Sequence, residues 1–117
     1  METSILTSTK KLLGIDETFD AFDLDVMTFI NAAFATLTQI GVGPVDGFMI
    51  ESVDEEWADF VTDIQQLNQV RNYVFLKVRV LFDPPSTGYL VDSMQKQINE
   101  AEWRLNGLAD FPEVEPV

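Results

Sequence analysis

Apolar residues recur at three- and four-residue intervals along most of the chain, and glycine and proline breaks separate the runs. The segment from Ser4 to Leu13 ends at Gly14, where a helix C-cap commonly places a glycine. Lys10 and Lys11 lie in its last turn, where cations complement the helix dipole. This pattern predicts a short first helix.

A second helical pattern begins at Asp23, a residue suited to an N-cap, and continues to about Gln39. Its apolar stripe is expected to face the core and consists of Met27, Ile30, Phe34 and Leu37. The segment 41–44, Gly-Val-Gly-Pro, ends this helix, and Asp46-Gly47 adds a second turn signal. The following run, Phe48-Met49-Ile50, is predicted to lie in an extended loop or to form a short strand within it.

Helical character resumes at Asp54, with Glu55 and Glu56 in the first turn and Trp57 and Phe60 on one side. From Asp63 the apolar face is unusually wide, which predicts a central helix. Its apolar positions are Ile64, Leu67, Val70, Val74, Phe75, Val78, Leu81 and Phe82. The valines at 74, 78 and 80 leave a strand as the alternative.

Asp83-Pro84-Pro85 ends the central helix, because proline lacks an amide hydrogen and restricts the residue before it. Ser86 or Thr87 is suited to cap a last helix that ends at Gly107. Its regular stripe consists of Leu90, Met94, Ile98, Ala101 and Leu105. The sequence therefore predicts an all-α fold, a small bundle of about four to five helices with an extended loop.

With 117 residues, the chain can build one core but not two. Residues 1–107 are expected to form one helical domain. Residues 108–117 contain two prolines, several acids and no periodicity, which predicts a flexible acidic C-terminal tail or arm that orders on a partner.

The chain contains no His and no Cys, which removes the usual general base, the usual nucleophilic triads and most transition-metal sites. Acidic clusters at 16–25 and 54–56 lack the spacing of a calcium loop and are better explained as solvated helix N-termini. Gly41, Gly43 and Gly47 do not match a nucleotide-binding pattern. We therefore expect a protein that is not an enzyme and has no cofactor and no metal, with a carboxylate-based enzyme as a disfavoured alternative.

The formal net charge of -13 argues against nucleic acid as a direct ligand, because phosphate contacts need clustered Lys and Arg. It fits an acidic wall along which DNA moves without adhering. Arg71, Lys77 and Arg79 are expected to form ion pairs within or between subunits. The uncharged stretch between Asp25 and Asp46 is too polar for a membrane span, and residues 1–4 lack the features of a signal peptide.

Three segments of the chain resemble segments of the head-tail connector (adaptor) proteins of tailed bacteriophages. They are ILTSTKKLLGI at 5–15, TQIGVGP at 38–44 and YVFLKVRVLFDPP at 73–85. The likeness spans most of the chain apart from the acidic tail. It implies an all-helical structural subunit located at the head-tail interface of the virion and made in the host cytoplasm.

The resemblance also implies partners. The subunit would form a ring of about twelve copies below the portal protein, closed by heterologous contacts. This ring would continue the DNA channel without specific DNA binding and would dock the stopper or tail-completion protein. The alternative hypothesis is a small acidic adaptor or inhibitor, a nucleic-acid mimic that binds a basic protein surface.

Exposed apolar groups and Arg are the residues expected to carry such contacts. For the apolar ones the competing interpretation is a place in the chain's own core, and for the arginines it is intramolecular pairing. The candidate interface residues are Phe48, Met49, Ile50, Trp57, Arg71, Arg79, Trp103 and Phe111.

Overall fold

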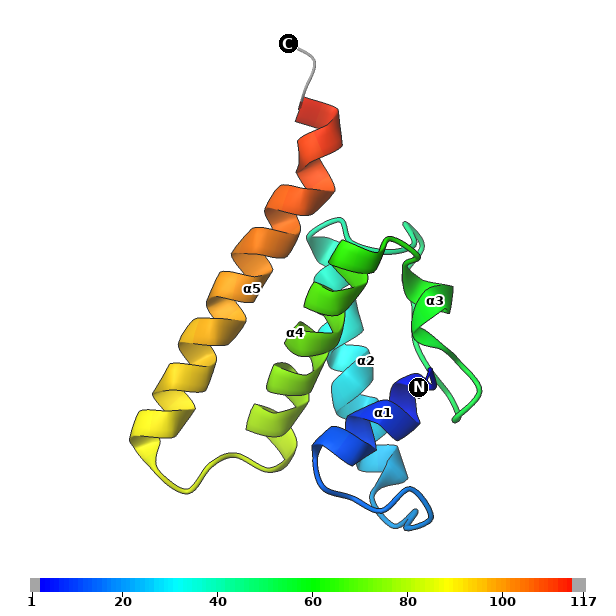
Figure 1. Ribbon diagram of the computed structural model, residues 1–117, viewed down its shortest axis with the longest axis vertical. Coiled ribbons are helices and arrows are strands. Elements are labelled where there is room, and N and C mark those ends of the chain that lie inside the picture. Colours follow the sequence, from blue (N-terminus) through cyan, green and yellow to red (C-terminus); the bar gives the residue numbers. More distant parts are fainter. Residues whose placement is uncertain (1–2, 115–117) are drawn as a thin grey trace.

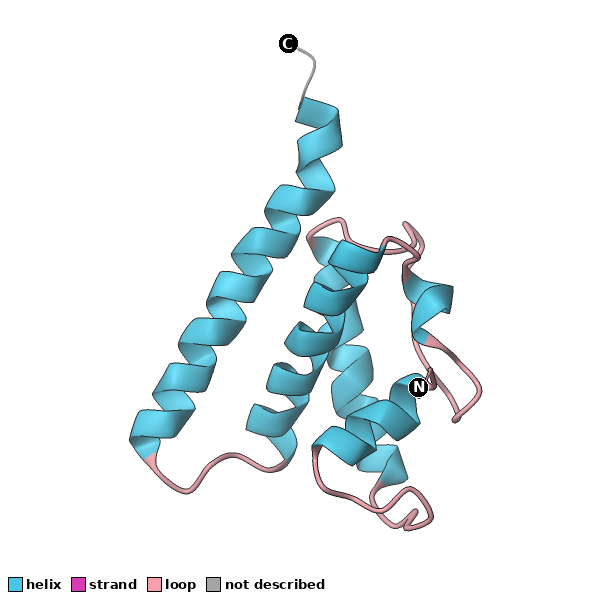
Figure 2. Cartoon of the chain, in the orientation of Figure 1, coloured by secondary structure: helices cyan, strands magenta, loops and turns pink. Residues whose placement is uncertain are grey.

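The computed structural model describes residues 3–114, with side chains described as far as residue 107. Within this part the chain forms α1 (Ile5–Leu12), α2 (Asp23–Gln39), α3 (Trp57–Phe60), α4 (Ile64–Phe82) and α5 (Gly88–Val114). Figure 2 shows helices joined by loops, without a strand in the described residues. The predicted all-α fold is confirmed.

The central helix is α4, which contacts each of the other four helices. In Figure 1, α5 runs antiparallel beside α4 and is joined to it by the loop at the lower end of the view. On the other side α4 packs against α2, while α1 crosses near the lower end and α3 lies away from α5. The resulting molecule measures 51 × 36 × 24 Å.

Side-chain caps fix where three of the helices begin. The Ser4 hydroxyl accepts the Thr7 amide at 3.2 Å, the Asp63 carboxylate accepts the Gln66 amide at 3.0 Å, and the Thr87 hydroxyl accepts the Leu90 amide at 3.3 Å. For α2 the prediction was one residue off, because Phe22 is the N-cap and Asp23 is the first helical residue.

One hydrophobic core joins all five helices. In α2 the buried residues are Val26, Ile30, Ala33, Phe34 and Leu37, so Met27 of the predicted stripe lies only at the core's edge. The strand alternative for 74–80 is wrong, since those residues lie in α4 with Val74 and Val78 fully buried. From α5, Ile98 and Leu105 reach the core.

The predicted helical stretch from Asp54 shrinks to the single turn of α3. The Glu55 carboxylate instead accepts the amides of Glu51 and Ser52, at 2.9 and 3.2 Å. The Glu55 carbonyl accepts the amide of Ile5 at 3.0 Å, in the isolated bridge between Ser4 and Glu56. Contacts with the start of α1 therefore replace the helical bonds that the local pattern favoured.

The predicted helix end at Gly107 is wrong, because α5 continues to Val114. Gly107 is not among the glycines with positive φ, so it does not form a left-handed cap. A single glycine costs a helix only about 1 kcal/mol and does not by itself end one. The division into residues 1–107 and 108–117 stays a prediction, and the tail side chains, including Phe111, lie outside the described residues.

Candidate interaction surfaces

Four phenylalanine rings form a row where the loop 13–22, the start of α2 and the end of α4 meet. Phe19 and Phe22 pack edge to face at 5.5 Å between ring centroids, and Phe22 packs in the same way on Phe82 at 5.4 Å. Phe29 lies 6.4 Å from Phe82. We call these four residues the aromatic row. Phe19 and Phe22 leave 48% and 41% of their surface in solvent, so the row is only half covered by the chain.

A buried lysine holds the loop that presents this row. Lys10 is 2% exposed, and its ammonium donates to the carbonyls of Glu17 at 3.2 Å and Phe19 at 2.8 Å. The same ammonium forms an ion pair with the Asp23 carboxylate at 2.7 Å, so its charge has a partner as well. The sequence pattern suggested only a helix-dipole role for Lys10, because burial by a loop that follows later in the chain is not visible in a helical period.

The loop is also fixed internally. The Asp16 carboxylate accepts the Thr18 hydroxyl at 2.6 Å and the Thr18 amide at 2.8 Å. These hydrogen bonds, led by the hydroxyl, hold the pKa of Asp16 below its usual value. Together with Lys10 they give the exposed turn one defined conformation.

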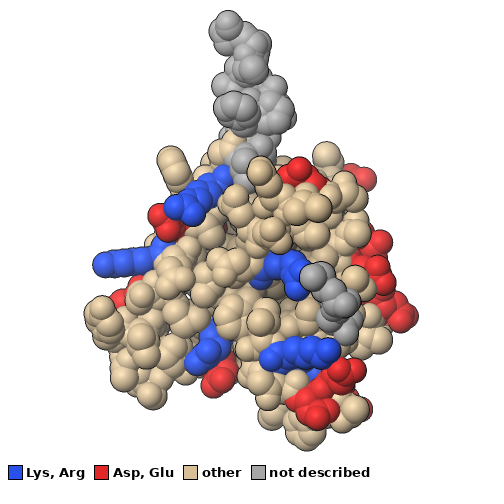
Figure 3. Space-filling model, in the orientation of Figure 1, with Lys and Arg blue, Asp and Glu red and all other residues tan. Residues whose placement is uncertain are grey.

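Charge is distributed unevenly over the molecule. Between Lys11 and Arg71 the sequence has twelve Asp or Glu residues and no Lys or Arg. Figure 3 shows acidic groups along the right-hand edge, near α3, and at the lower end, near the loop 13–22. The aromatic row therefore lies in an acidic environment.

The candidate contact residues in the loop between α2 and α3 differ in their exposure to solvent. Met49 is exposed, whereas Phe48 is half-buried against Phe34 at 5.1 Å between centroids. Ile50 is buried, and its backbone is held on both sides by the Asn31 amide, at 2.7 and 3.0 Å. Ile50 thus occupies the intramolecular core, the alternative considered for it above.

Trp57 likewise belongs to the core. Its indole N–H donates to the Ser8 hydroxyl at 2.8 Å, and the Arg71 guanidinium lies 5.6 Å from the ring centroid. Arg79 donates to the Asp83 carbonyl, and Lys77 lies 3.9 Å from the Glu102 carboxylate. Lys77 and Arg79 therefore have intramolecular acidic partners, as expected, whereas the partner of Arg71 is an aromatic ring and not an acid.

The outer face of α5 presents exposed aromatic side chains. Tyr89, Lys96 and Trp103 follow at intervals of seven residues and lie opposite the buried Ile98. Trp103 is 76% exposed and Tyr89 is 82% exposed. Trp103 is thus available for the intermolecular contact predicted for it, and Tyr89 joins it on the same face.

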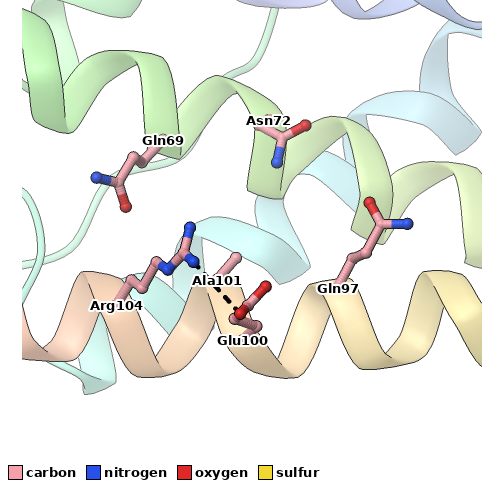
Figure 4. Close-up of a pocket in the computed structure, with 6 residues that line it drawn as sticks. All are labelled: Gln69, Asn72, Gln97, Glu100, Ala101 and Arg104. Carbon is pink, nitrogen blue, oxygen red and sulfur yellow. Dashed lines mark hydrogen bonds and ion pairs between the residues drawn. The ribbon is translucent and has the colours of Figure 1, made fainter.

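A polar hollow lies between α4 and α5 (Figure 4). Gln69 and Asn72 face it from α4, and Gln97, Glu100, Ala101 and Arg104 face it from α5. Arg104 pairs with Glu100 at 3.3 Å. The hollow is lined mainly by amides and one ion pair, so it offers hydrogen bonds rather than a nucleophile or an acid–base pair.

Tyr73 has a strongly shifted pKa, and its role is structural. Burial, followed by the Glu102 carboxylate, raises the pKa of Tyr73 well above its usual value. The Tyr73 hydroxyl donates to Glu102 at 2.8 Å and so ties α4 to α5. Within the described residues, no group of three carboxylates is placed to hold a metal ion.

The fold and these surfaces define a small helical protein whose prominent features are contact surfaces. A family model described as phage connector protein matches residues 5–110. The chain belongs to this phage connector family, and the resemblance seen in the sequence is confirmed. No curated protein and no solved structure matches the chain. Among the described helices, none is long and apolar enough to cross a membrane.

The aromatic row contains contact candidates that the sequence interpretation missed. The acids of segment 16–25 indicate a solvated turn and helix start, and that pattern does not single out Phe19 and Phe22 as contact residues. Two phenylalanines three residues apart within an acidic turn were the available signal. The contact of Phe22 with Phe82, sixty residues later, could not be read from spacing.

Proposed function

We propose that this protein is a head-tail connector subunit that forms a ring below the portal, continues the DNA channel and docks the stopper or tail-completion protein. The observation that carries the proposal is the family match over residues 5–110, which runs from the first residue of α1 into α5. It includes residues of all five helices and not only a single helical hairpin.

Exposed apolar side chains support assembly into a ring. Large hydrophobic residues with most of their surface in solvent occur on several elements, including Leu24, Val45, Ile64 and Trp103. Contacts with neighbouring subunits would cover such surface, and head-to-tail contacts that close on themselves produce a ring. The ring is proposed to share the portal's symmetry, with about twelve copies.

The acidic charge supports a passive role toward DNA. A net charge of -13 opposes adhesion of the phosphate backbone, which suits a channel wall past which DNA slides. We further propose that the subunit does no chemistry and uses no cofactor. Its work is assembly and continuity of the channel.

The test is to mix the purified chain with portal particles of its own phage and to image the product by cryo-electron microscopy. We expect a ring of density coaxial with the portal, which then binds the stopper or tail-completion protein. Portal particles incubated with an unrelated acidic protein are the control. Absence of the ring at saturating protein would contradict the proposal, and tight binding to an unrelated basic protein would favour the acidic mimic.

A further inference from the structure

The aromatic row and its neighbours expose apolar surface that the hydrophobic core does not cover. Phe19 and Phe22 are each about half exposed, and Leu24 and Leu81, on the adjoining ends of α2 and α4, are exposed as well. Clustered apolar surface of this kind marks an interaction site. Aromatic rings are also the side chains that contribute most to binding per residue.

The row is held in place before any partner arrives. Lys10 anchors the carbonyl of Phe19 from inside, Asp16 closes the turn on Thr18, and Phe82 supports Phe22 from α4. A surface whose conformation is already fixed loses little conformational entropy on binding. The loop 13–22 therefore has the properties of a preformed docking surface.

The charges around the row specify the partner's charge. Asp16, Asp20 and Asp25 are exposed, and none of them is in an ion pair within the described chain. The nearby cations are already engaged, since Lys10 pairs with Asp23 and Lys11 with Glu17. A partner that covers the rings must supply its own positive charge to the three carboxylates.

A second copy of this chain is poorly suited to supply that charge. In the described residues Lys77, Arg79 and Arg104 already pair with acids of their own chain, and Arg71 lies over Trp57. Lys96 is exposed on α5 and is in no ion pair among these residues, but one lysine cannot balance three carboxylates. Each copy also carries a net charge of -13, so its approach to an acidic end is repelled. The occupant is therefore a different, basic protein.

We propose that the aromatic row docks a basic segment of a partner protein, with an apolar side chain against Phe19 and Phe22 and flanking Arg or Lys side chains on Asp16, Asp20 and Asp25. Arg suits this site, because its guanidinium both pairs with carboxylates and stacks on aromatic rings. This inference deepens the proposed function and rests on it for the partner being a virion component. Neighbouring copies in the ring would meet through other surfaces.

The first test uses the intact chain and a short synthetic peptide that alternates Arg and Leu. Peptides with Glu in place of Arg, or Ala in place of Leu, are the probe controls. Binding is mapped by amide chemical shifts. We expect shifts concentrated at residues 16–25 and 79–83, and none with either control peptide. Binding of the Arg-Leu peptide that maps to α3 or α5, or no binding at all, would overturn the inference.

Two sets of variants separate the rings from the charges. Phe19→Ser with Phe22→Ser removes the exposed rings, and Asp16→Asn with Asp20→Asn and Asp25→Asn removes the acids. Each set should weaken the affinity for the Arg-Leu peptide at least about tenfold.

The matched control sets are Tyr89→Ser with Trp103→Ser, and Asp46→Asn with Glu51→Gln and Asp54→Asn. They should change the affinity by less than about twofold. Equal losses of affinity in the control sets would show that the peptide is attracted to any exposed ring or acid, and would contradict a specific site. Helicity by circular dichroism verifies folding, and the charge variants keep every apolar contact.

The second test distinguishes this inference from the proposed function. The wild-type chain and the ring-removal variant are mixed with portal particles and with the stopper or tail-completion protein. Loss of one of these contacts in the variant alone supports the docking surface. Undiminished binding by the variant would refute the inference and leave the connector function intact. If the wild-type chain binds the basic peptide but no virion protein, the connector function is contradicted and the docking surface for a basic segment is still supported.

Discussion

At the scale of single residues, Lys10 links three segments that are separate in the sequence. Its ammonium joins the end of α1, the loop 13–22 and the start of α2 through two carbonyls and the Asp23 carboxylate. A buried ammonium is tolerable only because it is hydrogen-bonded and its charge has a partner. Removal of the lysine would leave these acceptors without their donor.

Lys10→Met should therefore destabilise the chain by about 3 kcal/mol, because one member of a buried ion pair is lost. Lys11→Met is the matched control, since the Lys11–Glu17 pair is exposed and such pairs contribute about 0–1 kcal/mol. Urea unfolding followed by circular dichroism measures both. Equal effects of the two substitutions would contradict the role given to Lys10.

Gly43 combines a left-handed backbone with close contact to a ring. Its φ is +85°, and a Cβ atom there would come within 2.5 Å of the Phe60 ring. Gly14 has a similar φ of +82° but no atom within 4 Å of a built Cβ. Substitutions at Gly14 and Gly43 therefore separate the free-energy cost of the left-handed backbone from that of the clash with the ring.

Gly14→Ala should cost about 1–2 kcal/mol for the left-handed conformation alone. Gly43→Ala should cost about 1–3 kcal/mol more, because the ring of Phe60 must move within the core. Thermal unfolding of the two variants beside the wild type gives the difference. Similar costs at both glycines would show that Phe60 yields without strain.

Glu55 makes the stability of the fold depend on pH in the acid range. Burial favours a higher pKa for Glu55, but the amides of Glu51 and Ser52 and the Ser52 hydroxyl outweigh it and lower the pKa. A carboxyl group with a lowered folded-state pKa stabilises the fold above its unfolded pKa and loses that contribution as pH falls through the folded value.

Glu55→Gln should thus lower the unfolding midpoint at pH 7, and the gap to wild type should narrow as pH falls below the ordinary pKa of 4.5. Glu51→Gln is the control, because Glu51 contributes its amide and not its carboxylate to this network. Denaturant titrations from pH 7 to the acid limit of solubility test this. A constant gap across that range would show that the charge of Glu55 is not involved.

At the scale of elements, α5 is attached to the bundle mainly along one side. It packs on α4 through Ile98 and Leu105 and through the Tyr73–Glu102 hydrogen bond. Its outer face, with Tyr89 and Trp103, is left to solvent. The position of the helix therefore depends on a few buried side chains.

Leu105→Ala should cost about 2–5 kcal/mol and speed hydrogen exchange along α5, because a fully buried side chain leaves a cavity. Leu90→Ala, at an exposed position of the same helix, should cost less than about 1 kcal/mol. Chemical denaturation and amide exchange by mass spectrometry measure the two effects. Uniform exchange in both variants would mean that Leu105 does not anchor the helix.

At the scale of the whole molecule, the two tryptophans report on different places. Trp57 is in the core and Trp103 is on the outer face of α5. If the lateral contacts of the proposed ring include that face, the proposed assembly on the portal should shield Trp103 from acrylamide while Trp57 stays shielded throughout. The fluorescence difference between wild type and Trp103→Phe isolates the signal. Unchanged quenching of Trp103 in the assembled ring would place the lateral contacts elsewhere.

The amino-acid sequence determined the helices and most of their ends, because these depend on local rules. Gly14, the break at 41–44 and Pro84-Pro85 end helices through their own backbone geometry, and the apolar period marked α2 and α4. It also indicated the connector family, through three segments that lie within the matched residues 5–110.

Tertiary structure alone decided which side chains face solvent and which are covered by distant segments. Ile50 and Trp57 entered the core, Lys10 was buried by a loop that follows it, and Phe22 met Phe82 across sixty residues. Such contacts depend on how helices pack in space, and a periodic pattern records only the face of one helix. For the same reason, the acidic turn that looked merely solvated in sequence became the support of an aromatic surface.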